Sequence, residues 1–240
     1  MASGVGRTEV IFIGLDDTDV AGAPGTNKLA RRMAGRLAER WHVRAITRHQ
    51  LLVHPDIPYT KNNSSAAIML CAGSEGDWKE IARMASECIR AWSADGSDPG
   101  LCVVEKVGEE VMAFGRRAQE QVLQKGEALA LALRCGVHAE ELGGTGGGVI
   151  GALAAVGLAA TGDDGRIVQL GHWPDDLSGR QPAETLRQRG VDLIVSEQDG
   201  AQVEPESVDV GKRLRPNYRG GRVVLYVEST PDGWQALRKP

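Results

Sequence analysis

The stretch Val10–Leu29, VIFIGLDDTDVAGAPGTNKL, decides how the rest of the chain is interpreted. Its apolar run Val10–Ile13 predicts a buried strand, because the run is short and is followed by turn residues. Three carboxylates come next, then a loop rich in Gly and Pro, and a helix is expected from about Thr26. The stretch therefore predicts a strand, an acidic turn, a glycine loop and a helix.

The acidic turn indicates a metal site. Asp16, Asp17 and Asp19 repel one another beyond the strand end unless a cation shares them. Mg²⁺ prefers one or two carboxylates plus phosphate oxygens, and the free N–H groups at a helix start attract an anion. We interpret the turn as a motif that binds Mg²⁺ and a nucleotide. An ordinary acidic turn with Asp capping is the alternative.

Composition sets broad limits on the class of protein. The 240 residues are 42% hydrophobic and 25% charged, which is enough for one large domain or two small ones. The net charge of −4 gives no overall nucleic-acid footprint, so an RNA partner would need a local basic patch. The four cysteines form no CxxC pair, so neither a zinc site nor a disulfide framework is expected. No stretch resembles a secretion signal or a membrane span, and we expect a cytoplasmic protein without membrane contact.

Hydrophobic spacing predicts alternating strands and helices along the rest of the chain. Residues 78–92 predict an amphipathic helix with Asp77 as its N-cap, and 109–134 a helix interrupted near Gly126. Further strands are expected at 43–53, 66–71, 101–107, 167–170, 191–196 and 222–228. We predict an α+β fold, with a mixed sheet, flanking helices and a packed ferredoxin-like subdomain. The expected division is a nucleotide-binding, kinase-like domain from residues 8–65 and 136–240, and the subdomain from 66–135.

Two more polar segments are candidates for binding phosphate. The loop HPDIPYTKNNSS contains Lys61, Asn62 and Asn63, a dense run of donors, although a hydrophilic turn has the same composition. The cluster ELGGTGGGVIG at 141–151 precedes a helical run of small residues. Glycine there lets the backbone approach a phosphate closely, but close packing of a helix on a sheet also uses glycine. Lys28 lies in a first helical turn, where a cation is unfavourable, so a nearby anion would explain it.

The order of these motifs resembles a known enzyme family. GLDDTD, a Gly/Thr loop, LLVHPDIPYTKNN and a glycine loop running into VIGALAAVG are similar to the kinase-type and ferredoxin-like domains of archaeal tRNA(Ile) agmatidine synthetase. The resemblance spans roughly residues 9–170. That family uses ATP to activate a cytidine at the anticodon wobble position, so that agmatine can displace the phosphate.

The resemblance implies roles for particular residues. Asp16, Asp17 and Asp19 match the acidic metal and nucleotide motif, and Thr26 matches the threonine linked to phosphoryl transfer. Lys61 falls in the basic loop. Two loops depart from the family: Gly25-Thr26-Asn27 replaces Cys-Thr-Thr, and residues 60–64 replace Lys-Thr-Arg-Gly-Asn. The family also continues into an OB-fold and a zinc ribbon that grip tRNA, and we expect this short homologue to lack them.

Together these patterns predict an enzyme of the phosphotransferase or ligase type that uses ATP and Mg²⁺ on a small polar or nucleobase-like acceptor. We expect weak or absent tRNA binding and leave an oligomer open. A non-catalytic nucleotide-binding or tRNA-modification accessory module is the alternative. The expected catalytic residues are Asp16, Asp17, Asp19, Thr26 and Lys61. The expected nucleotide-binding residues are Gly25, Thr26, Asn27, Lys28, Asn62, Asn63, Thr145, Gly146, Gly147 and Gly148.

Overall fold

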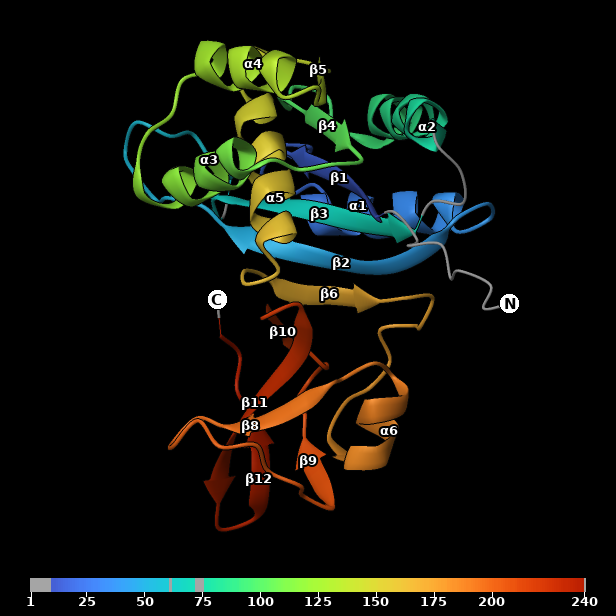
Figure 1. Cartoon of the computed structure of the whole chain (residues 1–240), viewed down its shortest axis with the longest axis vertical. Coiled ribbons are helices and arrows are strands. Elements are labelled where there is room, and N and C mark those ends of the chain that lie inside the picture. Colours follow the sequence, from blue (N-terminus) through green and yellow to red (C-terminus); the bar gives the residue numbers. More distant parts are fainter. Residues whose placement is uncertain (1–9, 61, 72–75, 240) are drawn as a thin grey trace, which may run out of the picture.

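A computed structural model describes residues 10–60, 62–71 and 76–239. Within these residues the chain forms a mixed twelve-stranded sheet flanked by helices (Figure 1), and the expected α+β class is confirmed. The order along the sheet is β5-β4-β1-β3-β2-β6-β10-β11-β12-β9-β7, and β8 pairs with β11. The strands are β1 (Val10–Asp16), β2 (His42–Gln50), β3 (Ser64–Cys71), β4 (Gly100–Val104), β5 (His138–Glu141), β6 (Arg166–Leu170), β7 (Arg180–Pro182), β8 (Leu193–Ser196), β9 (Ser207–Asp209), β10 (Asn217–Arg219), β11 (Arg222–Thr230) and β12 (Gly233–Ala236). The helices are α1 (Thr26–Leu37), α2 (Asp77–Trp92), α3 (Glu109–Glu120), α4 (Lys125–Arg134), α5 (Gly148–Thr161) and α6 (Ala183–Gln188).

The strand β1 lies between β3 and β4 and pairs antiparallel with both. The sequence suggested residues 66–135 as a separate subdomain. Both neighbours of β1 belong to that segment, except for the first two residues of β3. Strands on both sides of the expected boundaries are thus hydrogen-bonded in one sheet. The division of the chain into domains at residues 66 and 136 stays a prediction.

Helices cover both faces of this part of the sheet (Figure 1). Ile11, Ile13 and Leu15 are fully buried on one face, in a core with α1 and α2. Burial of each such side chain stabilises the fold by about 1.5–3 kcal/mol. On the other face α5 crosses β1 so closely that a Cβ on Gly14 would lie 1.9 Å from the carbonyl oxygen of Ala152. The helices α3 and α4 pack against α5. The close crossing of α5 and β1 places the start of α5 beside the end of β1.

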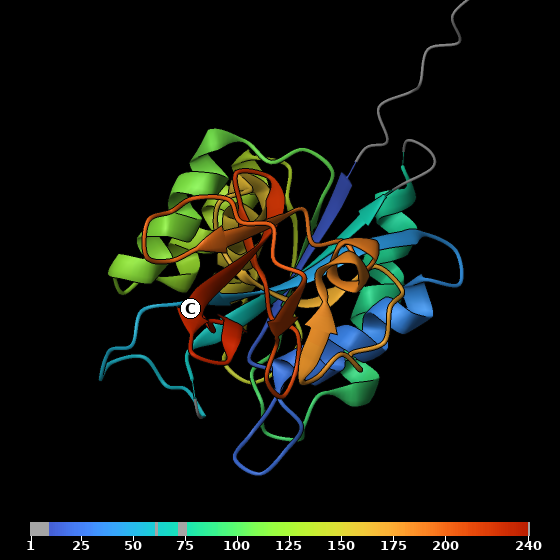
Figure 2. The same cartoon turned by 90° about the horizontal axis from the view of Figure 1, so that it is seen from below.

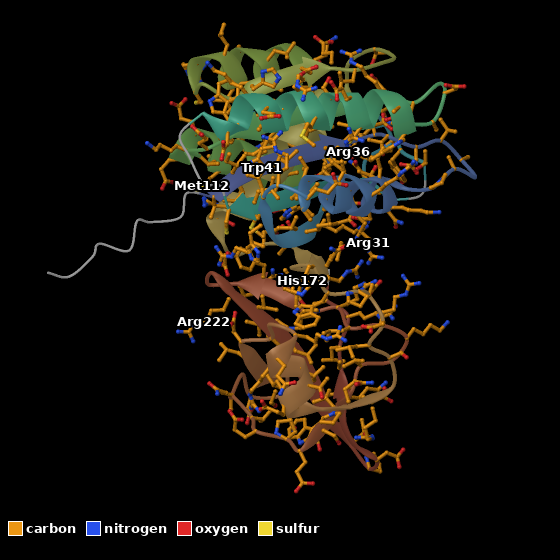
Figure 3. The ribbon with its side chains drawn as sticks, turned by 90° about the vertical axis from the view of Figure 1, so that its right-hand side faces the viewer. Arg31, Arg36, Trp41, Met112, His172 and Arg222 are labelled. Atoms are coloured by element: carbon orange, nitrogen blue, oxygen red, sulfur yellow. The ribbon has the colours of Figure 1, made fainter. Side chains whose placement is uncertain are left out.

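The C-terminal residues form a smaller part below β6, seen end-on in Figure 2. Here α6 packs on strands β8, β9 and β11 around a separate apolar core. The strand β6 joins the two parts, because it pairs with β2 on one side and with β10 on the other. Asp175 adds an ionic link: its carboxylate accepts from Arg31 of α1 at 2.7 Å and from Arg215 at 2.7 Å. Figure 3 shows Arg31 on the side of α1 that faces the C-terminal part.

Two helix limits differ from the sequence-based expectation. The segment 109–134 is two helices separated at residues 121–124, because Gln121 adopts an extended backbone and Leu123 is buried; Gly126 lies inside α4. Asp77 is the first residue of α2 rather than its N-cap. Gly76 takes the N-cap position with φ 92°, and the Asp77 carboxylate instead accepts from the Trp41 indole at 3.2 Å. In the described part of the chain, no helix has the length and apolar character needed to cross a membrane.

Candidate functional site

The acidic turn follows directly from the end of β1. Asp17 has a left-handed backbone (φ 50°), the one such residue other than glycine among those described. This conformation is costly for most residues, but Asp tolerates it. The loop after α2 fixes the turn: the Asp98 amide donates to the Asp17 carbonyl at 3.1 Å, and the Ala94 amide donates to the Thr18 carbonyl at 3.0 Å. The carboxylates of the turn therefore stand on a firmly held backbone.

The electrostatics of the turn favour a cation. Burial raises the pKa of Asp16 to about 7; the Asp17 and Asp19 charges add to this rise, and a backbone hydrogen bond from Asp17 opposes it. Burial also raises the pKa of Asp17 to about 6, helped by the charges of Asp98 and Asp19. Crowded carboxylates hold protons in this way when nothing positive neutralises them.

The first residue of α1 is tied to this turn. The Thr18 hydroxyl donates to the Thr26 hydroxyl at 3.1 Å, and Thr26 donates to the Asp19 carboxylate at 3.3 Å. The Asp19 carboxylate also accepts from Thr60 at 3.3 Å, which brings in the loop before β3. The helix begins after Gly25 without a side-chain cap. Thr26 is consequently buried with its hydroxyl directed at a carboxylate.

The glycine loop before α5 is held by Asp98. This carboxylate accepts from the Gly146 amide at 2.6 Å, from the Gly147 amide at 3.0 Å and from the Thr145 hydroxyl. Lys125 secures the other side of the loop by donating to the Glu141 carboxylate and to the Thr145 carbonyl, both at 2.6 Å. A protein carboxylate thus already satisfies two of the N–H groups that the sequence suggested for phosphate.

Close packing accounts for the later glycines of the same cluster. A Cβ on Gly148 would lie 2.2 Å from the Asp98 carbonyl oxygen, and one on Gly151 would lie 1.7 Å from the Asp16 carboxylate. Gly146 differs, with φ 77°, a backbone that L side chains rarely adopt. The cluster therefore serves both a tight turn and the approach of α5 to β1, and the packing alternative weighed from the sequence holds for Gly148 and Gly151.

These elements surround one cleft of about 310 Å³. The acidic turn, the loop before β3 and the glycine loop, which lie far apart in the sequence, all line it. The residues expected in the site that line the cleft are Asp16, Asp17, Asp19, Thr26, Asn62, Asn63, Thr145, Gly147 and Gly148. Its apolar wall includes Leu51, Ile57, Pro58, Tyr59, Val122, Leu123 and Ile150.

Four expected binding residues do not line this cleft. Gly25, Lys28 and Gly146 lie outside its wall, and so does Asn27, whose buried Oδ1 has no hydrogen-bond partner among the described residues. Lys61 lies outside the residues that the structure describes. No three His, Cys, Asp or Glu side chains in the described chain are already arranged to hold a metal ion. The Mg²⁺ site stays a prediction.

Sequence reasoning missed several residues of the cleft. Asp98 is the most important of them, because its carboxylate holds the glycine loop and its backbone amide donates to the Asp17 carbonyl of the acidic turn. It lies in the segment ADGSDPG at 94–100, whose composition is typical of an ordinary turn. The polar residues of the wall that were not expected are Asp56, Thr60, Asp98, Gln121 and Gln124.

Comparison with known proteins adds an independent observation. No family model matches the chain. Over 152 residues, which are 61% of this chain and 35% of the relative, it is 32% identical to TiaS of Pyrobaculum neutrophilum, a 2-agmatinylcytidine synthetase for an isoleucine tRNA. The chain is a partial homologue of TiaS. The expected resemblance is confirmed, and the chain spans about a third of the length of this curated relative.

Solved structures agree with this similarity. The crystal structure of TiaS in complex with its isoleucine tRNA and ATP is 26% identical with a TM-score of 0.55, over 62% of this chain and 36% of that one. A tRNA fluorescent labelling enzyme is 27% identical with a TM-score of 0.54 over the same shares. A complex of TiaS with the tRNA, AMPCPP and agmatine is 26% identical with a TM-score of 0.53, again over 62% and 36%. TiaS is thus known with tRNA bound, and the comparisons give no support to the expectation that tRNA binding is weak or absent.

Proposed function

We propose that this chain binds Mg·ATP in the cleft and uses it to activate a nucleobase-like or small polar acceptor by phosphoryl transfer. The observation that carries the proposal is the convergence of three distant polar motifs on one cleft. The partial homology to TiaS supports an ATP-dependent tRNA-modifying enzyme as the class, since TiaS has been crystallised with ATP and an isoleucine tRNA.

The carboxylates of the turn fit a divalent cation. Burial, together with neighbouring like charges, raises the pKa of Asp16 to about 7 and that of Asp17 to about 6, and a bound cation would lower both by favouring the carboxylate form. Asp98, which also lines the cleft, would offer a further carboxylate oxygen to the same ion. When bound, Mg²⁺ would supply the positive charge that phosphoryl transfer requires.

Hydroxyl and amide groups of the cleft would position the phosphates. The resemblance links the Thr26 hydroxyl to phosphoryl transfer. This hydroxyl donates to the Asp19 carboxylate, so Asp19 can accept its proton. Asn62 and Asn63 offer amide donors from the loop before β3, one of which Asn63 already gives to the Leu52 carbonyl. The N–H groups of Gly146 and Gly147 donate to the Asp98 carboxylate. These two hydrogen bonds would stiffen the loop rather than bind a phosphate. Phosphoryl transfer depends on such positioning more than on covalent chemistry.

The apolar wall gives the adenine base a surface. Ile57, Pro58 and Tyr59 come from the loop before β3, whereas Val122 and Leu123 come from the segment between α3 and α4. Apolar lining with a few directed polar groups is typical of small-molecule sites. The volume of about 310 Å³ suits a ligand at the lower end of that class.

The test is ATP turnover in the presence and absence of Mg²⁺, with Asp17→Asn and Asp19→Asn as variants. Both should lose metal-dependent turnover, and both should fold, because each removes a mutually repelling charge. Asp95→Asn is the matched control: it lies in the 94–100 segment, is exposed and is absent from the cleft wall.

Two results would refute the proposal. The first is wild-type turnover in both variants, and the second is unfolding of both, which would make the acidic turn structural. Nucleotide binding without any turnover in the wild type, tested with tRNA as acceptor, would favour the non-catalytic alternative.

A further inference from the structure

Two arginines meet where β2 pairs with β6. Arg48 and Arg166 are direct cross-strand partners, so their side chains lie side by side on one face of the sheet. Ile46, two residues before Arg48 on β2, belongs to the core formed with α1, which identifies this face as the one that α1 covers. Both arginines are only half-buried, so solvent reaches them.

Among the described side chains, no carboxylate pairs with either arginine. Arg48 donates to the Ser64 hydroxyl at 3.1 Å and to the Gln50 amide oxygen at 3.1 Å, both neutral. Arg166 makes neither a hydrogen bond nor an ion pair with any described side chain. Burial lowers the pKa of Arg48, and burial together with the charges of Arg48, Arg215 and Arg238 lowers that of Arg166. The pair is therefore a source of uncompensated positive charge.

Arg48, Arg166, Arg215 and Arg238 together form what we call the arginine patch. They are scattered over the sequence and come from β2, β6 and the C-terminal part, so no local pattern indicates that they gather. The net charge of −4 also gives no indication of a local basic patch. Asp175 neutralises Arg215, so the uncompensated charge of the patch is centred on Arg48 and Arg166. The fold thus gathers positive charge that the sequence leaves scattered.

The patch adjoins the cleft without being part of it. Ser64, which accepts from Arg48, lines the cleft, but none of the four arginines does. A ligand phosphate on the patch would therefore lie beside the nucleotide. Two uncompensated arginines side by side suit two neighbouring phosphates, as in a nucleic-acid backbone.

We propose that the arginine patch binds the phosphodiester backbone of an RNA strand whose reacting base enters the adjoining cleft. This inference rests on the proposed function, and it replaces the expectation of weak or absent RNA binding. It assigns to the chain an RNA surface of its own, formed where the sheet of the larger part continues into the C-terminal part.

The test compares the double variant Arg48→Gln/Arg166→Gln with a control, Arg83→Gln/Arg90→Gln. The control removes the same charge from α2, which covers the sheet near β4, away from β6. Binding of labelled, unfractionated tRNA is followed by fluorescence anisotropy at several salt concentrations. In the patch variant we expect an affinity at least about tenfold lower near 0.1 M salt. The slope of log affinity against log salt should become shallower by about one for each arginine removed. The control should change the affinity by no more than about twofold and should leave the slope unchanged.

Two further measurements separate this role from others. A fluorescent ATP analogue should bind the patch variant as it binds the wild type, because the arginines lie outside the cleft wall. The melting temperature should stay the same or rise, because repulsion between two half-buried cations is removed; a structural role would lower it.

The inference is overturned if wild-type protein does not bind tRNA, if the patch variant binds it normally, or if the control loses as much affinity. Parallel loss of the ATP analogue would assign the patch to the nucleotide instead. None of these binding assays requires turnover. The proposed function is tested by ATP turnover of the Asp19→Asn variant, whereas the RNA-binding role of the patch is tested by tRNA affinity. The two can therefore fail independently.

Discussion

Replacing Gly151 by Ala should displace a carboxylate of the cleft. An added Cβ would lie 1.7 Å from the Asp16 carboxylate, whereas real Cβ contacts are at least about 3.0 Å, so Asp16 must retreat by about 1.3 Å. The carboxylate has little room, because the crossing of α5 and β1 encloses it. Gly35 offers a matched comparison: it also lies inside a helix, α1, and a Cβ there would meet nothing within 4 Å.

The two substitutions should have opposite effects on stability. Gly→Ala in an open helical position stabilises by about 0.5–1 kcal/mol, which is the expectation for Gly35→Ala. Overpacking costs about 1–3 kcal/mol, which should exceed that gain at Gly151. The difference between the variants should be about 2 kcal/mol, or about 4–8 °C in melting temperature for a chain of this size. A shift of about 1 Å in a positioned group also costs up to ~100-fold in rate, so Gly151→Ala should lose ATP turnover.

Urea unfolding and thermal melting measure the difference, and Asp16→Ala provides the check. Combining it with Gly151→Ala should remove most of the overpacking cost, because the clashing carboxylate is gone. If Gly151→Ala stabilises as much as Gly35→Ala, or if Asp16→Ala fails to relieve its cost, α5 does not approach Asp16 as described and the reasoning is refuted.

Two further predictions concern pH. Asp16 has a pKa of about 7 in the fold against an ordinary value of 3.8, so it stabilises the fold below pH 4, and this contribution is lost as the pH rises through 7. Urea titrations without metal should show that loss, and Asp16→Asn should reduce it; an unchanged pH profile would contradict the burial of Asp16. Asp175 has its pKa lowered to about 2 by Arg215 and Arg31 against the effect of burial, so its contribution is present above pH 4 and lost as the pH falls through 2. Asp175→Asn should therefore cost about 2 kcal/mol at pH 7 and little at pH 2, and equal costs at both would rule out the ionic link.

The sequence predicted the parts of the fold that depend on local pattern. The strand β1, the start of α1 at Thr26 and the helical character of 78–92 follow from apolar spacing, and the structure agrees. The acidic turn and the glycine loop were recognisable because unusual residue types are concentrated there. The structure brings both to the cleft, together with Asn62 and Asn63 from the loop before β3.

The remaining features depend on pairing between distant segments. Asp98 belongs to a turn of ordinary composition, and only the antiparallel pairing of β4 with β1 brings its loop to the acidic turn. The arginine patch depends in the same way on the register between Arg48 and Arg166. The short strands β7, β9 and β10, each of three residues, carry too little pattern to be recognised before the sheet is known.

The place of β6 in the sheet also bears on aggregation. Without the C-terminal part, β6 would present a row of unpaired N–H and C=O groups, the kind of edge along which sheets of separate molecules join. In the whole chain β10 covers it: the Ile167 amide donates to the Pro216 carbonyl at 2.7 Å, and the Tyr218 amide donates to the Gly165 carbonyl at 2.9 Å. The opposite edge, β5, is short and ends in Glu140 and Glu141, charges that discourage such joining. A chain cut after residue 170 would keep the cleft but expose β6, and it should self-associate more than the 240-residue chain.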